Sequence, residues 1–163
     1  MTNNELVNQV TETWKKHNEI LLLLLEKIPL KGFSAVPFGS KGRDVAAQFF
    51  HLNRVRLNWL VYHKSGKTKK LPRFNKKKPP TAAELKKSLK VSGYEVEKFI
   101  RDSLLTGSSP RLFGKNIVRW MGYLIAHESH HRGQIMIALK QNKMKLPDKI
   151  AVEGLWGKWL YGK

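Results

Sequence analysis

Apolar residues recur at steps of three and four positions over four long stretches of this chain, which is the spacing of one buried face of an α-helix. These stretches predict helices over about residues 4–27, 40–62, 81–104 and 115–141. Strand-like alternation of apolar and polar residues is absent, and so is an internal repeat. We therefore expect an all-α fold, a four-helix bundle whose helices pack their apolar faces together.

Capping and turn-forming residues mark the limits of the predicted helices. Residues 29–39 hold two prolines and two glycines and predict a loop, after which Ser40 is the expected N-cap of the second helix, without a capping box. The run from Thr81 to Glu84 is a capping box, and Asn142 predicts the end of the fourth helix. At 163 residues, the chain is expected to form a single domain, residues 1–163.

The C-terminal tail is short and rich in aromatic residues, with two tryptophans and one tyrosine between Trp156 and Tyr161. We expect this tail to cover the open end of the bundle. Lining a substrate pocket or forming a subunit contact is the functional alternative.

Composition limits the compartment and the available chemistry. Cysteine is absent, which excludes disulfides and thiolate metal ligands and fits a reducing compartment. The five leucines from Leu21 to Leu25 are bracketed by glutamates and are much too short to span a membrane. The N-terminus also lacks the features of a signal peptide. These observations predict a cytoplasmic protein without membrane association.

The net charge of +19 is extreme and uneven. Residues 1–26 carry four acids and two lysines, a net charge of −2, so the remainder carries +21. Such a field favours polyanions or small anionic molecules as partners, although solubility alone is the plainer explanation.

Three histidines within five positions give the fourth predicted helix its chemical signal. On an α-helix, His127 and His131 lie one turn apart, on the same arc as Trp120 and Leu124, so they point toward the protein interior. Two imidazoles at this spacing can bind one metal ion. The structural alternative is that one of them is a hydrogen-bonded core histidine. A core role is also what we expect of His17 on the first helix, and metal ligation is the less favoured alternative for it.

His127, Glu128 and His131 also satisfy H-E-x-x-H, the helix signature of zinc proteases. The metzincin extension fails, because Gln134 and Ile137 occupy its Gly and His positions. A thermolysin-like third ligand would have to come from the short tail, and the strand that such proteases offer to substrates is missing. The protease is therefore the weakest alternative.

His51, on the second predicted helix, is the better third ligand. A bundle brings the inward faces of helices two and four together, and catalytic zinc commonly has three protein ligands with one open position.

The run H-E-S-H-H-R-G-Q-I from His127 to Ile135, with a histidine early in the second helix, resembles the DinB/YfiT-like superfamily of small four-helix metalloproteins. The resemblance covers essentially the whole chain. It implies that His51, His127 and His131 bind a divalent metal ion and that His130 is a motif residue without a ligand role. Members include thiol-dependent S-transferases and an isomerase that uses low-molecular-weight thiols, and they are often homodimers.

The expected activity follows from the metal. Three neutral nitrogens leave the ion its full charge, so it can lower the pKa of bound water or of an incoming thiol. Zinc is the first expectation and nickel the second, since imidazole suits both. Together with the resemblance, which implies a thiol S-transferase, this chemistry leads us to expect either that activity or a hydrolase, acting on a small anionic or thiol substrate. No catalytic side chain is identified; Glu128 is a weak candidate, because it projects about 100° away from His127.

A long basic loop separates the second and third predicted helices. Residues 64–80 contain eight lysines or arginines and no acid, with Phe74 among them. This interleaving is typical of single-stranded nucleic-acid binding. A solvated surface loop with one anchoring phenylalanine is the alternative. The candidate polyanion contacts are Lys69, Lys70, Arg73, Lys76, Lys77 and Lys78.

Overall fold

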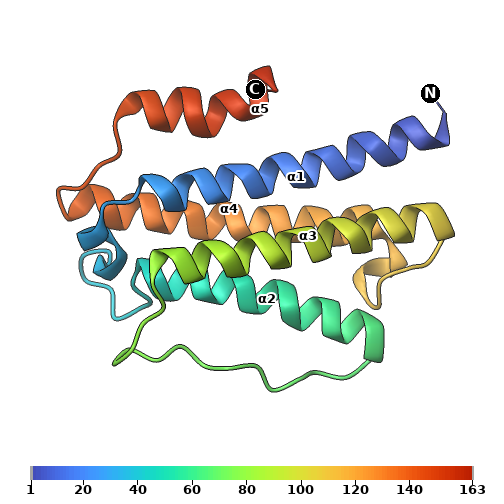
Figure 1. The fold of residues 1–163 in the computed structure, drawn as a ribbon, viewed down its shortest axis with the longest axis horizontal. Coiled ribbons are helices and arrows are strands. Elements are labelled where there is room, and N and C mark those ends of the chain that lie inside the picture. Colours follow the sequence, from blue (N-terminus) through green and yellow to red (C-terminus); the bar gives the residue numbers. More distant parts are fainter. Residues whose placement is uncertain (1, 163) are drawn as a thin grey trace.

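Four long helices run side by side in the computed structural model, which describes residues 2–162 (Figure 1). They are α1 (Asn3–Lys27), α2 (Val45–Ser65), α3 (Ala82–Thr106) and α4 (Ile117–Gln141). The shorter elements are the 3-10 helices η1 (Leu30–Ser34) and η2 (Phe113–Lys115), the π-helix η3 (Lys149–Trp156) and the final helix α5 (Gly157–Tyr161). The predicted all-α class is confirmed, and the described residues contain no strand.

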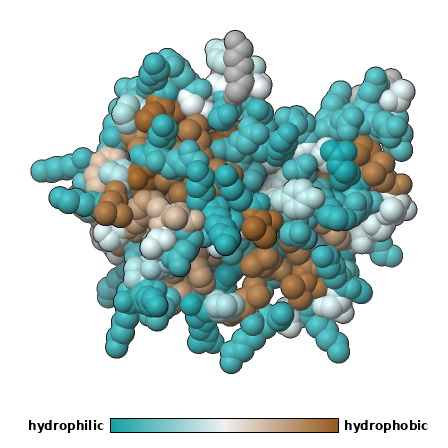
Figure 2. Space-filling view, viewed as in Figure 1, coloured by the Kyte–Doolittle hydropathy of each residue, from teal (hydrophilic) through white to brown (hydrophobic). Residues whose placement is uncertain are grey.

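None of these helices combines the length and the apolar character needed to cross a membrane. On the face shown in Figure 2, hydrophilic side chains cover most of the surface, and hydrophobic areas lie between them.

The helix directions explain the long basic loop. In Figure 1, α2 and α3 run in the same direction, opposite to α1 and α4. The chain must therefore return along the whole of α2 before α3 begins. A helix of 21 residues is about 31 Å long, which an extended chain covers with about ten residues. The topology thus sets a minimum length for segment 66–81, which has 16 residues, whereas it does not require the segment's charge.

The observed caps confirm one predicted helix start and correct another. The Thr81 hydroxyl accepts the N–H of Glu84 at 3.2 Å, and the Glu84 carboxylate accepts the N–H of Thr81 at 2.7 Å, so the predicted capping box exists. The prediction that α2 starts at Ser40 is wrong. Asp44 is the N-cap, and its carboxylate accepts the Ala47 N–H at 2.7 Å.

The C-terminal segment lies along the side of α1 (Figure 1). The prediction that this segment covers the open end of the bundle is therefore wrong. The pentaleucine explains this position. Leu21, Leu24 and Leu25 are buried in the core, while Leu23 lies against Gly154 of η3, where a β-carbon would approach its side chain to 3.1 Å.

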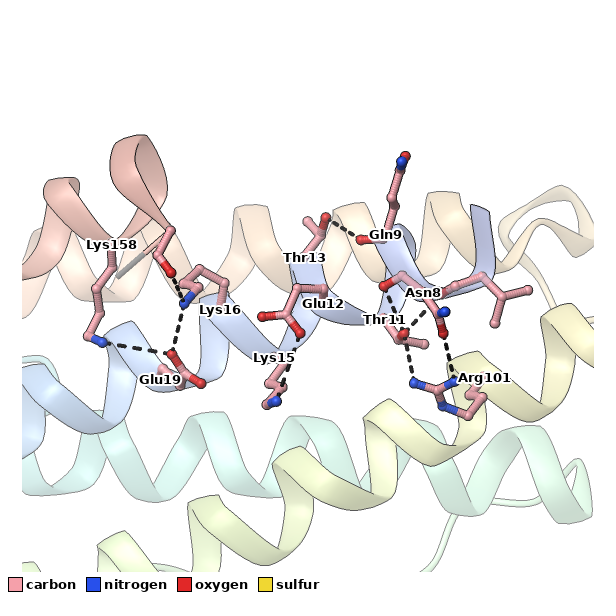
Figure 3. A network of polar contacts seen from close by, with 12 residues as sticks. Asn8, Gln9, Thr11, Glu12, Thr13, Lys15, Lys16, Glu19, Arg101 and Lys158 are labelled. Atoms are coloured by element: carbon pink, nitrogen blue, oxygen red, sulfur yellow. Dashed lines mark hydrogen bonds and ion pairs between the residues drawn. The ribbon is translucent and has the colours of Figure 1, made fainter. Parts of the chain in front are cut away.

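Polar contacts also hold this segment on α1, as Figure 3 shows. The ammonium group of Lys16 donates to the carbonyl of Gly162 at 3.2 Å, and that of Lys158 lies 3.8 Å from the carboxylate of Glu19. Glu19 is one of four glutamates that recur every seventh residue along α1, with Glu5, Glu12 and Glu26, so part of this acidic stripe contacts the chain's own C-terminal segment.

Two clusters of buried apolar residues form the core, one in each half of the bundle. The first includes Leu21, Leu52, Leu89 and Ile135; the second includes Trp14, Leu60, Val96 and Leu124. On each long helix, the buried residues between the two clusters are polar or small, namely His17 on α1, Arg56 on α2, Ser92 and Gly93 on α3, and Glu128 and His131 on α4.

A fully buried ion pair between Arg56 of α2 and Glu128 of α4 lies in this intervening layer. The Arg56 guanidinium donates to the two carboxylate oxygens of Glu128 at 2.6 and 2.7 Å. Its third nitrogen donates to Asn18 Oδ1 of α1 at 2.8 Å and to the Leu89 carbonyl of α3 at 3.1 Å. His17 Nε2 of α1 lies 2.9 Å from Glu128 Oε2. We call His17, Asn18, Arg56 and Glu128 the polar layer.

The polar layer determines the ionisation of Glu128. Burial alone would raise the pKa of this carboxyl, but the charge of Arg56 and the hydrogen bonds from Arg56 and His17 outweigh burial and lower the pKa to about 2. Glu128 is therefore a carboxylate over the whole physiological range.

Arg56 also corrects the predicted register of α2. Steps of three and four from Leu52 predict that Val55, Trp59 and Tyr62 share its buried face, yet these three residues are only partly buried, and Arg56 and Leu60 take the inward positions. A charged residue on the inner face breaks the apolar periodicity from which the register was read.

We predict that the polar layer is strongly coupled. Arg56→Met leaves a buried carboxylate without its cation, and Glu128→Leu leaves a buried guanidinium, so each variant should lower the free energy of unfolding by about 3 kcal/mol or more. The double variant removes both charges and should be more stable than the sum of the single effects predicts. Urea unfolding of the four proteins measures this coupling.

The exposed pair Lys98 and Asp102 on α3 provides the control. Asp102→Asn should leave the unfolding midpoint unchanged within error, because water screens an exposed pair. Additive effects at Arg56 and Glu128 would contradict the interpretation of the polar layer as one unit.

Candidate metal centre

Helices α2 and α4 bring His51, His127 and His131 together. One ring nitrogen of each residue lies within 4.8 Å of the other two, which is compact enough to hold a metal ion. The ring centroids are 4.7 Å apart for the pair on α4, and 5.3 and 4.9 Å from His51 to His127 and His131. A set of three imidazoles suits zinc, nickel and related divalent ions.

The environment keeps these imidazoles neutral, as metal ligands must be. Burial, supported by the nearby charge of Arg43 and by the neighbouring histidines, lowers the pKa of His51 to about 4. Burial and the adjacent histidines also lower the pKa of His131 to about 4. The pKa of His127 is lowered by burial, although the charge of Glu128 opposes that shift.

Gln48 orients His131. Its side-chain oxygen lies 3.2 Å from His131 Nδ1, and only 2% of the Gln48 residue is exposed. If this nitrogen donates its hydrogen to Gln48, the lone pair of Nε2 is left for a metal ion.

His127 is held on its other side by an aromatic contact. Its ring stacks on Tyr123, with centroids 5.9 Å apart and an interplanar angle of 19°. The buried Nδ1 atom of His127 has no hydrogen-bond partner. His17 and His63 also have one buried ring nitrogen without a partner, so the proximity of two other imidazoles is what distinguishes His127 from a structural histidine.

Two cavities flank the histidines and share Gly42 and Arg43, which precede α2. One, of about 530 Å³, is lined by His131, Gln48 and His130; the other, of about 420 Å³, is lined by His51. Lys41, Arg54 and Lys76 add positive charge to the smaller cavity. Within the described chain, no carboxylate lines either cavity.

The remaining residues of the histidine motif lie outside the cluster. His130 is exposed, and its Nε2 accepts from the Gln134 amide at 2.9 Å. Glu128 faces the polar layer, where Arg56 and His17 engage its two oxygens, so the weak catalytic candidate has a structural position. His17 is a buried partner of Glu128, which fits the core role predicted for it.

The basic loop lies close to the same face. Arg73, Lys69 and Lys70 line a neighbouring cleft, whereas Lys76 lines the smaller cavity. Phe74 is partly buried and packs edge-to-face on Phe50 of α2, with centroids 5.6 Å apart. This contact makes Phe74 an anchor of the loop.

Sequence reasoning missed four residues that shape the site: Arg43, Gln48, Arg56 and Tyr123. Gln48 had a signal, because it lies three positions before His51 and therefore on the same side of the helix. No sequence signal indicated the partners of Arg56, because Asn18, Leu89 and Glu128 come together only in the folded chain.

The chain matches a known protein family. Residues 1–142 match the model described as the DinB family. The matched range includes α1 to α4 and all three histidines, and it ends before η3. A search of curated proteins finds no match.

We predict that the wild-type protein binds one divalent ion per chain and that replacing any of the three histidines by alanine abolishes stoichiometric binding. Zn²⁺ and Ni²⁺ titrations followed by metal analysis of the desalted protein measure this. Gln48→Met should weaken binding about tenfold or more, because it releases the His131 ring. His130→Ala, a matched change in the same motif, should keep the ion.

The same titrations have a defined pH dependence. Because His51 and His131 have pKa values near 4, protons compete with the metal at these two residues only as the pH falls toward about 4, well below the range of an ordinary imidazole.

Full metal content in the His127→Ala, His131→Ala double variant would rule the site out.

Proposed function

The chain belongs to the DinB family, and on that premise we propose that it is a metal-dependent enzyme that transfers a low-molecular-weight thiol to an electrophilic substrate. The observation that carries this proposal is a cluster of three neutral imidazoles between two cavities that contain cations and no carboxylate. A divalent ion held by three neutral nitrogens would lower the pKa of a thiol beside it toward neutrality.

The chain's own residues have separate tasks in this reaction. Gln48 and Tyr123 hold the His131 and His127 rings in the orientation that binding requires. Arg43 lines both cavities and would attract an anionic thiol or stabilise its thiolate. Because Arg43 is exposed, an incoming anion can reach it directly from solvent.

The proposed step is a nucleophilic substitution. The thiolate sulfur donates an electron pair to an electrophilic carbon and forms an S–C bond, while the bond to the leaving group breaks and that group takes the bonding pair. The thiol proton passes to solvent, so no side-chain base is required.

Hydrolysis is less well supported, because it normally needs a side chain that accepts a proton from water. Residues 2–162 offer the cavities no carboxylate, and Glu128 is fully buried in its pair with Arg56. The same burial argues against a zinc protease, in which this glutamate would have to reach water at the metal.

We predict chelator-sensitive thiol transfer. A panel of small thiols is assayed with an activated aromatic halide, with and without a chelator, and product formation is followed by absorbance. Wild-type turnover should stop on metal removal and return when the ion is restored, and His51→Ala should be inactive under both conditions. His130→Ala should retain turnover. Activity that survives complete metal removal would overturn the proposal.

We propose a second function, the binding of a polyanion such as nucleic acid through the basic loop. The loop's eight cations lie in or next to one exposed crossover. None of these cations forms a salt bridge with an acid within residues 2–162. In addition, the topology explains why the loop is long but does not explain its charge. Neutralising phosphates with such residues releases counterions, so affinity depends strongly on salt.

We predict that replacing five loop lysines by glutamine weakens nucleic-acid binding and flattens its salt dependence. Removing one lysine–phosphate interaction should reduce the slope of log affinity against log salt by about 0.9 for duplex DNA. Fluorescence anisotropy with a labelled duplex over a range of salt concentrations measures the slope. The substituted residues are Lys69, Lys70, Lys76, Lys77 and Lys78.

A charge-matched variant separates a local effect from a general one. It replaces five exposed lysines elsewhere, namely Lys87, Lys90, Lys140, Lys143 and Lys149. Equal loss of binding in both variants would show that net charge, and not the loop, is responsible. Negligible wild-type binding at physiological salt would reject the second function.

A further inference from the structure

A cleft of about 600 Å³ lies between α2, the basic loop and the start of α4, next to the two cavities of the metal centre, and it shares Arg54 with the smaller of them. One wall comes from the loop, with Lys69, Lys70 and Arg73, and the other side carries Trp59, Tyr62 and Tyr123. The cleft thus places three aromatic side chains opposite several cations. No acidic residue of the described chain lines it.

Contacts with neighbouring rings hold the aromatic side chains of the cleft in place. Trp59 stacks on His63 with centroids 5.6 Å apart and an interplanar angle of 20°, and it also meets Phe113 edge-on at 4.9 Å. Tyr123 stacks on His127. Trp59 also meets Tyr62 and Tyr123 edge-on, at 6.0 and 5.9 Å. Rings fixed in this way lose little freedom when a flat ligand stacks on them.

The cations of the cleft are available for a ligand. Lys69, Lys70 and Arg73 are exposed, and the described residues provide no salt-bridge partner for them. Arg54, on α2, also lines the cleft, and its buried Nε atom has no hydrogen-bond partner. Arg54 also lines the smaller cavity beside His51, and the described residues give its guanidinium no salt-bridge partner.

We propose that this cleft binds single-stranded nucleic acid, with unpaired bases stacked on Trp59, Tyr62 and Tyr123 and the backbone phosphates contacted by Arg54, Lys69, Lys70 and Arg73. The inference rests on the polyanion binding proposed above and assigns its substrate class. A duplex keeps its bases stacked on each other and can use only the cations, whereas a single strand can use the rings as well. The cations continue beyond the cleft to Lys78, which favours a strand over a free nucleotide.

The experiment compares oligothymidylate of about 16 nucleotides, a duplex of equal length and thymidine monophosphate as probes for the full chain. The protein should bind the single strand at least about tenfold more tightly than the duplex, and the mononucleotide only weakly. Trp59→Leu and Tyr62→Leu keep an apolar side chain but remove the ring. Each should weaken single-strand binding about tenfold and leave duplex binding unchanged, with thermal unfolding as the check on folding.

Tyr94→Leu is the matched control, since Tyr94 is an exposed tyrosine on α3 outside the cleft, and it should have no effect. If single strand and duplex bind equally and neither ring variant changes the affinity, the cleft assignment is wrong while the polyanion function stands. Equal binding of the mononucleotide and the strand would also overturn it in favour of a nucleotide site. If no probe binds, the polyanion function itself fails.

Discussion

The buried pair of Arg56 and Glu128 is the interaction on which the rest of this structure depends. Through it and its immediate partners, one guanidinium touches all four long helices: a carboxylate of α4, an amide of α1, a backbone carbonyl of α3 and its own attachment on α2. Leucine clusters tolerate rotation and sliding of helices, because apolar contacts have no direction. Hydrogen bonds of this kind are satisfied in only one arrangement, so the pair fixes how α2 and α4 face each other.

The orientation of α4 that this pair fixes also determines the positions of the histidines in the candidate metal centre, because they belong to the same helix. Glu128 directly follows His127 and stands three positions before His131, so the rotation of α4 that lets Glu128 meet Arg56 also fixes the directions of both histidines, which meet His51 of α2. His51 lies five positions before Arg56 on the opposing helix. The close packing of α1 on α3 supports the same geometry, because a β-carbon on Gly93 would come within 2.5 Å of Asn18, a partner of Arg56.

Much of this architecture could be predicted from the sequence, because the information is local. Periodicity gave the long helices, the Thr81 capping box gave the start of α3, and ligand spacing singled out His127 and His131. Two predictions were wrong, the first over a local contact and the second over a contact between distant residues. Ser40 was predicted as the N-cap of α2, but Asp44 is the N-cap, and its carboxylate accepts the Ala47 N–H. The inner face of α2 was misassigned because an arginine there looks like a surface residue until its carboxylate partner is known.

The crossover between the parallel helices α2 and α3 has a consequence for the integrity of the molecule. A cut within residues 66–81 would divide the chain into one part with α1 and α2 and another with α3, α4 and the C-terminal helices. Because α1 packs on α3, and α2 packs on both α3 and α4, most of the helix contacts join one part to the other. His51 belongs to the first part and the other two cluster histidines to the second. The two fragments are therefore complementary halves of one core, and the three-imidazole cluster is a property of their association that neither half possesses alone.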